Sequence, residues 1–192
     1  MREIIFFGDS LTAGYGLASP SMESFPALLQ EKINKAGLAY KVINSGVSGD
    51  TSAAGLSRIA GVLERPIDVF VLELGANDML RGLMPQSTLK NLQEILNKVK
   101  ARHPEVKLLL LGMELPAWVP GERAQGFREV YRKLASDYDM AFVPFLLEGV
   151  AGMRHLNLVD GVHPVAEGYQ IIANTVWPVL RGLLTYTEEQ GI

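Results

Sequence analysis

The residues best suited to chemistry are a serine near the start of the chain and an aspartate and a histidine about 150 residues later. Ser10 stands in a Gly-Asp-Ser turn directly after four apolar residues, where a predicted buried strand ends. Asp160 and His163 are three positions apart, so their side chains can approach each other within a helical turn. A hydroxyl, an imidazole and an orienting carboxylate are the groups that a serine hydrolase requires. We therefore treat Ser10 as a candidate nucleophile.

Short apolar strands alternate with amphipathic helices along the chain, and these elements must position the three residues. The pattern predicts strands at residues 4–7, 40–43, 67–74, 106–111 and 141–143. It predicts helices at residues 24–37, 50–63, 85–102, 122–138 and 166–184, with a kink or break at Pro178. Residues 11–24 read as loop with one short helical turn. Because βαβ units give parallel strands, we expect a single domain over residues 1–192, a flavodoxin-like three-layer α/β/α sandwich with a five-stranded parallel sheet.

Two further loops follow predicted strands and should lie at the same edge of the sheet as Ser10. They carry Gly46, where the backbone can approach a substrate closely, and Asn77, whose amide offers two uncharged N–H donors. Two other connections are unusually apolar for exposed loops, which suggests a pocket for an acyl chain or an aryl group. The residues expected to line it are Met79, Leu80, Leu83, Leu115, Pro116 and Trp118.

Four blocks of the sequence resemble the SGNH hydrolase superfamily, the GDSL esterases and lipases. The blocks are Gly8-Asp9-Ser10-Leu11, Gly46 in its loop, Gly75-Ala76-Asn77-Asp78 and Asp160-Gly161-Val162-His163-Pro164. Ser-Gly-Asp-Thr-Ser at residues 48–52 and Glu-Leu-Gly-Ala-Asn-Asp at residues 73–78 further resemble the branch of bacterial multifunctional thioesterase/lysophospholipases and arylesterases. The resemblance covers residues 4–164, nearly the whole predicted fold.

The resemblance implies a role for each motif residue. Ser10 would be the nucleophile, His163 the general base and then acid, and Asp160 the carboxylate that orients His163. An oxyanion hole would be formed by the backbone N–H groups of Ser10 and Gly46 and by the side-chain amide of Asn77. The Gly-Asp-Ser-Leu context differs from the Gly-x-Ser-x-Gly elbow, so a typical α/β-hydrolase is not expected.

The expected function is hydrolysis of carboxylic esters without a cofactor or a metal. The expected substrates are short- to medium-chain acyl or aryl esters, with acyl thioesters and lysophospholipids as further candidates. Since His163 must be neutral to act as a base, the rate should fall at acid pH. Three alternatives stay open: a carbohydrate O-deacetylase, a non-catalytic binding protein, and a metal phosphoesterase that uses Asp9, Asn77, Asp78, Asp160 and His163.

Composition limits the partners and the compartment. A net charge of −3, a pI near 5.7 and the lack of a basic cluster argue against nucleic-acid binding. With no cysteine, disulfides, thiolate metal sites and a cysteine nucleophile are excluded. No apolar run approaches the length of a membrane span, so stable membrane insertion is not expected. The sequence has no signal-peptide shape, so we expect a cytoplasmic protein, or a periplasmic or secreted one if a leader was removed. We expect it to be a monomer or a weak homo-oligomer.

Other polar residues have predicted structural roles. Asp9 and Asp78 should fix their loops by accepting hydrogen bonds from backbone amides. Glu73 lies within the most apolar strand, so it should have a buried partner, for which Arg58 is the best candidate. His103 suits the end of a helix. His155 precedes the Asp160–His163 segment and could line a pocket, but a structural role is favoured.

Overall fold

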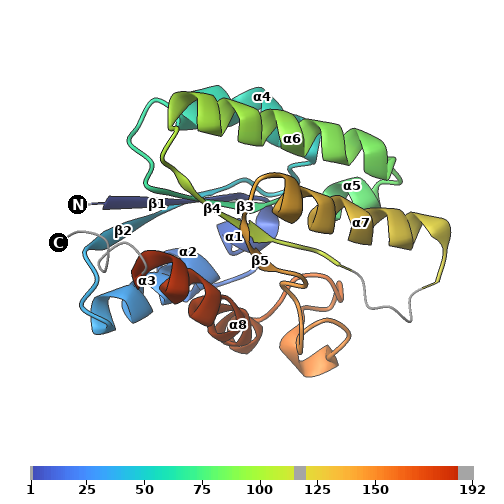
Figure 1. The fold of residues 1–192 in the computed structure, drawn as a ribbon. Helices are drawn as coiled ribbons and strands as arrows, with labels where there is room; N and C mark the ends of the chain where they lie inside the picture. The colour runs from blue at the N-terminus through green and yellow to red at the C-terminus, as the bar shows by residue number, and fades with distance from the viewer. Residues whose placement is uncertain (1, 115–119, 186–192) are drawn as a thin grey trace.

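Five parallel strands form the sheet at the centre of the computed structural model, which describes residues 2–114 and 120–185 (Figure 1). The strands follow the order β2-β1-β3-β4-β5, and every neighbouring pair is parallel. The strands are β1 (Arg2–Gly8), β2 (Tyr40–Gly46), β3 (Val69–Glu73), β4 (Lys107–Leu111) and β5 (Ala141–Val143). The chain therefore changes direction across the sheet between β1 and β3, and open α/β sheets bind ligands beyond the carboxyl ends of strands at such a point.

Helices cover both faces of this sheet, as Figure 1 shows. One face carries α4 (Ser52–Val62), α6 (Pro85–Arg102) and α7 (Glu122–Asp137), and the other carries α3 (Phe25–Lys35) and α8 (Ala166–Thr185). The predicted three-layer sandwich with a five-stranded parallel sheet is confirmed. Within the described residues, no helix combines the length and the apolar character needed to cross a membrane.

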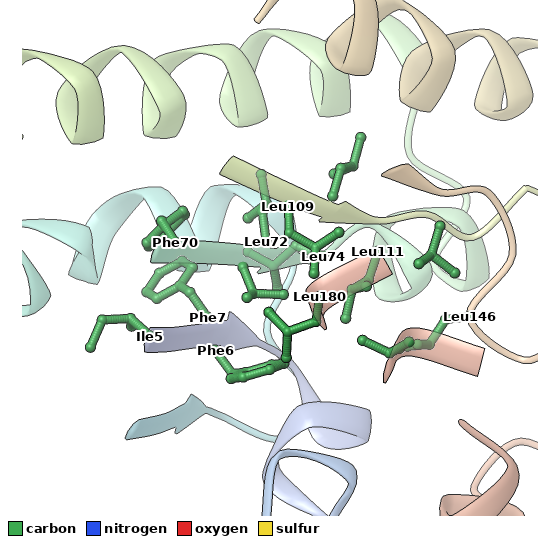
Figure 2. Packing of buried hydrophobic residues seen from close by; sticks show 14 of the residues in the cluster. Ile5, Phe6, Phe7, Phe70, Leu72, Leu74, Leu109, Leu111, Leu146 and Leu180 are labelled. Atoms are coloured by element: carbon green, nitrogen blue, oxygen red, sulfur yellow. The ribbon is translucent and has the colours of Figure 1, made fainter. Parts of the chain in front are cut away.

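Two phenylalanines of β1 show how this interior strand, which lies between β2 and β3, is buried from both sides. Phe6 packs edge-on against Phe25 of α3, with ring centroids 5.6 Å apart, on the side of the sheet where Figure 2 shows Leu180 of α8. Phe7 packs instead on Phe70 of β3, also at 5.6 Å. Neither Phe6 nor Phe7 is exposed. Because successive side chains of a strand point to opposite faces, a strand between two apolar layers reads as an uninterrupted apolar run.

Some element bounds differ from those predicted. The second strand continues to Gly46 because its last residues pair with the end of β1. Two short helices, α1 (Ser10–Ala13) and α2 (Pro20–Glu23), lie in or beside residues 11–24, which were expected to be a loop with one helical turn. A third, α5 (Ala76–Leu80), begins in a segment that was expected to be a loop. They are too short for a helical period to reveal them. Helix α8 continues through Pro178 without the expected break, since the carbonyl that loses its N–H partner belongs to an exposed residue, Asn174.

Candidate active site

Ser10, His163 and Asp160 meet at the carboxyl edge of the sheet. Ser10 Oγ lies 2.9 Å from His163 Nε2, and His163 Nδ1 lies 2.7 Å from Asp160 Oδ2. Ser10 is the first residue of α1, directly beyond β1, and the other two residues lie on the connection that precedes α8. The serine is buried, whereas the Asp160 side chain is 42% exposed. Ser10 and two residues that lie about 150 positions later in the sequence thus form one line of hydrogen bonds.

Asp160 determines which nitrogen of His163 carries the proton. Hydrogen bonds from the His163 backbone and ring, and from the Val162 N–H, lower the pKa of Asp160 to about 2. An ionised carboxylate can only accept hydrogen bonds, so His163 Nδ1 donates to it. In the neutral ring Nε2 is then free to accept the Ser10 hydroxyl proton. Such an arrangement can withdraw the proton as the serine oxygen attacks.

The loop that carries His163 is a turn built on Asp160, not the helical turn suggested by the spacing. Asp160 Oδ1 accepts from the backbone N–H groups of Val162 and His163 at 2.9 and 3.0 Å. The Leu158 N–H donates to the His163 carbonyl at 2.7 Å and closes the loop. One carboxylate therefore shapes the backbone with one oxygen and orients the imidazole with the other.

Asp9 caps the nucleophile turn, as predicted. Its Oδ1 accepts the Leu11 N–H at 3.0 Å, and its Oδ2 accepts from Asn77 Nδ2 at 3.0 Å. Burial raises the pKa of Asp9 to about 6. The Ser10 N–H has no acceptor among the described residues, so it is available to a ligand at the site.

Asn77 joins the loops that follow three neighbouring strands. Besides its bond to Asp9, Asn77 Nδ2 donates to the Asp50 carbonyl at 2.9 Å. Its neighbour Asp78 accepts the Ser52 N–H at 2.7 Å, which fastens α5 to the start of α4 and confirms the structural role predicted for Asp78. Asn77 therefore lies beside the nucleophile turn with its amide held in place.

Gly46 does not offer a free donor. Its N–H donates to Asn44 Oδ1 at 2.9 Å. A methyl group at this position would lie 2.3 Å from the backbone nitrogen of Ala13, so glycine is required because β2 passes close to α1. We expected a substrate to approach the backbone of Gly46 closely, but the backbone of α1 occupies that position instead. These contacts argue against the predicted oxyanion role of Gly46.

The N–H of Gly49, like that of Ser10, has no acceptor among the described residues. The carbonyl of the next residue, Asp50, accepts a hydrogen bond from the Asn77 side-chain amide. Gly49 is therefore one residue away from this contact. The Ser-Gly-Asp-Thr-Ser segment at residues 48–52 was the sequence signal that could have located this donor.

The sequence matches the GDSL-like Lipase/Acylhydrolase family over residues 6–171. The chain belongs to this family. Esterase TesA of Pseudomonas aeruginosa is 39% identical over 185 residues, which cover 95% of this chain and 90% of the relative. The Thioesterase 1/protease 1/lysophospholipase L1 of Escherichia coli K12 is 36% identical over 184 residues, which cover 95% of this chain and 85% of the relative. The crystal structure of TesA matches with a TM-score of 0.88 at 38% identity, over 95% of this chain and 100% of the other.

These matches confirm the predicted resemblance and show that the chain is a GDSL carboxylic ester hydrolase. They leave the metal phosphoesterase alternative without support. In residues 2–114 and 120–185, no group of three histidine, aspartate or glutamate side chains is arranged to hold a metal ion. Of the residues considered for that role, Asp9 and Asp78 instead accept backbone N–H groups.

Behind the turn of the candidate nucleophile Ser10 lies the buried carboxyl of Glu73, the last residue of β3. Its Oε2 accepts the Asp9 N–H at 3.2 Å and the Thr12 hydroxyl at 2.8 Å, and Oε1 has no partner among the described residues. Burial, followed by repulsion from Asp9, raises the pKa of Glu73 well above its usual 4.5. Glu73 thus has buried partners, as predicted, but the choice of Arg58 was wrong.

Arg58 pairs with Asp50 instead. Its Nε lies 2.5 Å from Asp50 Oδ2, and Nη2 donates to the Gly8 carbonyl at 3.0 Å. Its guanidinium also covers the ring of Phe7, 4.0 Å from the centroid. Arg58 therefore fixes the turn that contains Asp50 against the end of β1.

The apolar side chains expected to line an acyl pocket are largely exposed. Leu80 is 63% and Leu83 39% exposed, while Met79 is half-buried. Leu115, Pro116 and Trp118 lie outside the described residues.

The two remaining histidines lie on elements other than those that carry Ser10, Asp160 and His163. One ring nitrogen of His103, at the end of α6, lies 3.3 Å from the Leu63 carbonyl, a structural contact consistent with the absence of a predicted function. His155 is exposed in the short 3-10 helix η1 (Arg154–Leu156).

Proposed function

We propose that this chain is a serine esterase that hydrolyses carboxylic esters through an acyl-enzyme on Ser10. The observation that carries the proposal is the line from Ser10 Oγ to His163 Nε2 at 2.9 Å and from His163 Nδ1 to Asp160 at 2.7 Å. In this arrangement His163 is the general base and then the general acid, and Asp160 keeps the ring in the required tautomer.

The reaction has two halves, acylation of Ser10 and hydrolysis of the acyl-enzyme. Ser10 Oγ attacks the ester carbonyl carbon while His163 Nε2 takes the hydroxyl proton, which gives a tetrahedral oxyanion. Collapse of this intermediate breaks the bond to the alcohol or thiol, which leaves with the proton from His163. Water then attacks the acyl-enzyme, gives its proton to His163, and releases the acid as Ser10 regains its proton.

The oxyanion is proposed to bind the N–H groups of Ser10 and Gly49 and the side-chain amide of Asn77, with Gly49 in place of the predicted Gly46. The Ser10 and Gly49 N–H groups support this role because they have no acceptor among the described residues. Both hydrogens of Asn77 already have acceptors, Asp9 and Asp50. Donation to an oxyanion therefore requires Asn77 to share or exchange one of these bonds.

The proposed substrates are short- to medium-chain acyl or aryl esters, with acyl thioesters and lysophospholipids as additional candidates. Exposed apolar side chains at the end of α5 and on the segment that follows it support this class: Leu80 is 63% and Met84 61% exposed. Clusters of exposed apolar groups on a protein surface are typical of binding sites for apolar ligands. The carbohydrate O-deacetylase alternative is not favoured, since the relatives described above are named esterase and thioesterase.

The test compares wild type, Ser10→Ala and Ser136→Ala, a control at an exposed serine of α7. We expect Ser10→Ala to lower kcat by roughly 10⁴-fold or more and to abolish labelling by a fluorophosphonate, with an unchanged unfolding curve. Ser136→Ala should behave as wild type. Retention of activity by a folded Ser10→Ala variant would exclude the acyl-enzyme.

A series of p-nitrophenyl esters and matched acyl-CoA thioesters of increasing chain length defines the acyl preference. Leu80→Asn should lower kcat/KM most for the longer chains, because it removes apolar area from the proposed acyl surface. Met22→Asn is the matched control, since Met22 is 66% exposed on α2, and it should leave the chain-length profile unchanged. Equal effects of the two substitutions would contradict an acyl surface after α5.

A further inference from the structure

The ring of Tyr15 lies against the imidazole of His163, in a contact that the mechanism above does not use. The two ring centroids are 4.5 Å apart, and the ring planes are inclined by 46°. Tyr15 is 51% exposed, so the ring is not buried as part of the core. An aromatic face within about 6 Å of a cation attracts it. His163 becomes such a cation when it takes the serine proton.

The turn after α1 places this ring. The N–H groups of Gly14 and Tyr15 both donate to the Ser10 carbonyl at 3.0 Å. Gly14 adopts the left-handed conformation, with φ of 81°, that lets the chain reverse direction at the end of α1. The residue that supplies the nucleophile therefore also anchors, through its carbonyl, the ring that lies against the base.

The loop of His163 also packs on this turn. A methyl group at Gly16 would lie 2.4 Å from Leu158 Cδ1, so Leu158 occupies the space that this glycine leaves open. The Leu158 N–H donates in turn to the His163 carbonyl at 2.7 Å. The Tyr15 ring and the Gly16 backbone thus contact both the imidazole and the loop that carries it.

We propose that Tyr15 is a positioning residue for His163, whose ring face holds the imidazole in line with Ser10 Oγ and stabilises the imidazolium of the tetrahedral intermediate. This inference rests on the proposed function, because the imidazolium forms in catalysis only if His163 takes the serine proton. The charged groups near His163 are Asp160 on its own loop and Asp9 before α1, and neither is altered by a change at Tyr15.

If Tyr15 only covered His163, its removal would change the equilibrium between neutral and charged His163 in the opposite direction. If the ring only shielded His163 from water, its loss would hydrate the imidazolium better and favour the charged form. If the ring face attracts the cation, its loss disfavours the charged form. Replacing Tyr15 by leucine keeps most of the apolar cover and removes the aromatic face, so it isolates the second effect.

The kinetic test measures kcat and KM for an acyl ester between about pH 5 and pH 8 in wild type, Tyr15→Leu and Tyr15→Phe. In Tyr15→Leu we expect the acid limb of kcat/KM to move by about half a pH unit towards lower pH, with kcat at the plateau about threefold lower and KM nearly unchanged. Tyr15→Phe should restore both values, since it keeps the ring. An unmoved limb, a shift towards higher pH, or a loss confined to KM would each overturn the proposal.

A titration by nuclear magnetic resonance separates this proposal from the esterase proposal. The His163 ring signals are assigned by their loss in His163→Gln, and their midpoint is followed in wild type and Tyr15→Leu without any substrate. We expect the midpoint to move by about half a pH unit to lower pH in Tyr15→Leu. That result would support the ring contact even if the enzyme assay failed. An unchanged or raised midpoint would refute the contact even in an active esterase.

Discussion

Substitution of Glu73 tests how the fold accommodates a buried carboxyl behind the turn of Ser10. Glu73→Leu leaves the Asp9 N–H and the Thr12 hydroxyl, both inside the protein, without their acceptor. Each such loss costs about 1–3 kcal/mol, so we expect Glu73→Leu to lower the free energy of unfolding by about 4 kcal/mol. Glu73→Gln keeps an acceptor oxygen and has nearly the shape of a protonated acid. We expect it to cost less than about 1.5 kcal/mol at pH 7.

The pH dependence of stability tests whether Glu73 is protonated in the folded chain. Burial and the proximity of Asp9 raise the pKa of Glu73 well above 4.5, so the folded chain keeps a proton that the unfolded chain releases. Raising the pH above about 4.5 therefore favours the unfolded state, by at most about 1.4 kcal/mol per pH unit for one proton. Asp9 contributes in the same direction, but only up to its own pKa of about 6.

Urea unfolding of wild type and Glu73→Gln between about pH 6 and pH 8 measures this difference directly. We expect wild type to lose stability relative to Glu73→Gln as the pH rises, because titrating histidines affect both proteins equally and cancel in the comparison. If Glu73→Gln were as unstable as Glu73→Leu, or if the two pH profiles were parallel, Glu73 would be an ionised group with a charge partner and our reasoning would be wrong.

Three further substitutions test other parts of the site. Asn77→Ala should lower kcat by roughly 10²- to 10³-fold with little change in KM, as steady-state kinetics will show, and a change confined to KM would contradict its oxyanion role. Gly46→Ala should lower the free energy of unfolding by about 3 kcal/mol, because the new methyl would lie 2.3 Å from a backbone nitrogen; a neutral result in urea unfolding would refute the close approach. Arg58→Met should cost about 2–3 kcal/mol, whereas Arg65→Met, which breaks the more exposed pair with Glu3, should cost less than about 1 kcal/mol; equal costs would contradict the bracing role of Arg58.

The fold could be predicted because its strands are buried on both faces. Phe6 and Phe7 point into opposite layers, and such strands appear in a sequence as plain apolar runs between helical periods. Short elements gave no such signal. Helix α5, Ala76–Leu80, is too short to show a helical period, and its position depends on tertiary contacts such as the bond from Ser52 to Asp78.

The candidate site was predictable where a side chain performs the chemistry and less so where the backbone does. Ser10, Asp160 and His163 are identified by residue type and spacing, and the structure brings them within hydrogen-bonding distance. Our proposal moves the second backbone donor from Gly46 to Gly49, because a sequence does not show whether an N–H is already bonded. In Gly46 it is bonded to the side chain of Asn44, two residues earlier.

Glu73 is not paired with Arg58, as we had predicted, and its actual partners show how the site is assembled. Pairing opposite charges is the simplest way to bury a carboxyl, but a guanidinium at Glu73 would also have to be desolvated. Instead, Glu73 accepts hydrogen bonds from the Asp9 N–H and the Thr12 hydroxyl, both in the turn that contains Ser10. Burial favours the neutral form of Glu73. Because β3 ends at Glu73 and leads directly into α5, one strand end both braces the turn of Ser10 and presents Asn77 beside it. A shift of β3 relative to β1 would therefore displace both Ser10, the proposed nucleophile, and Asn77, a proposed oxyanion donor.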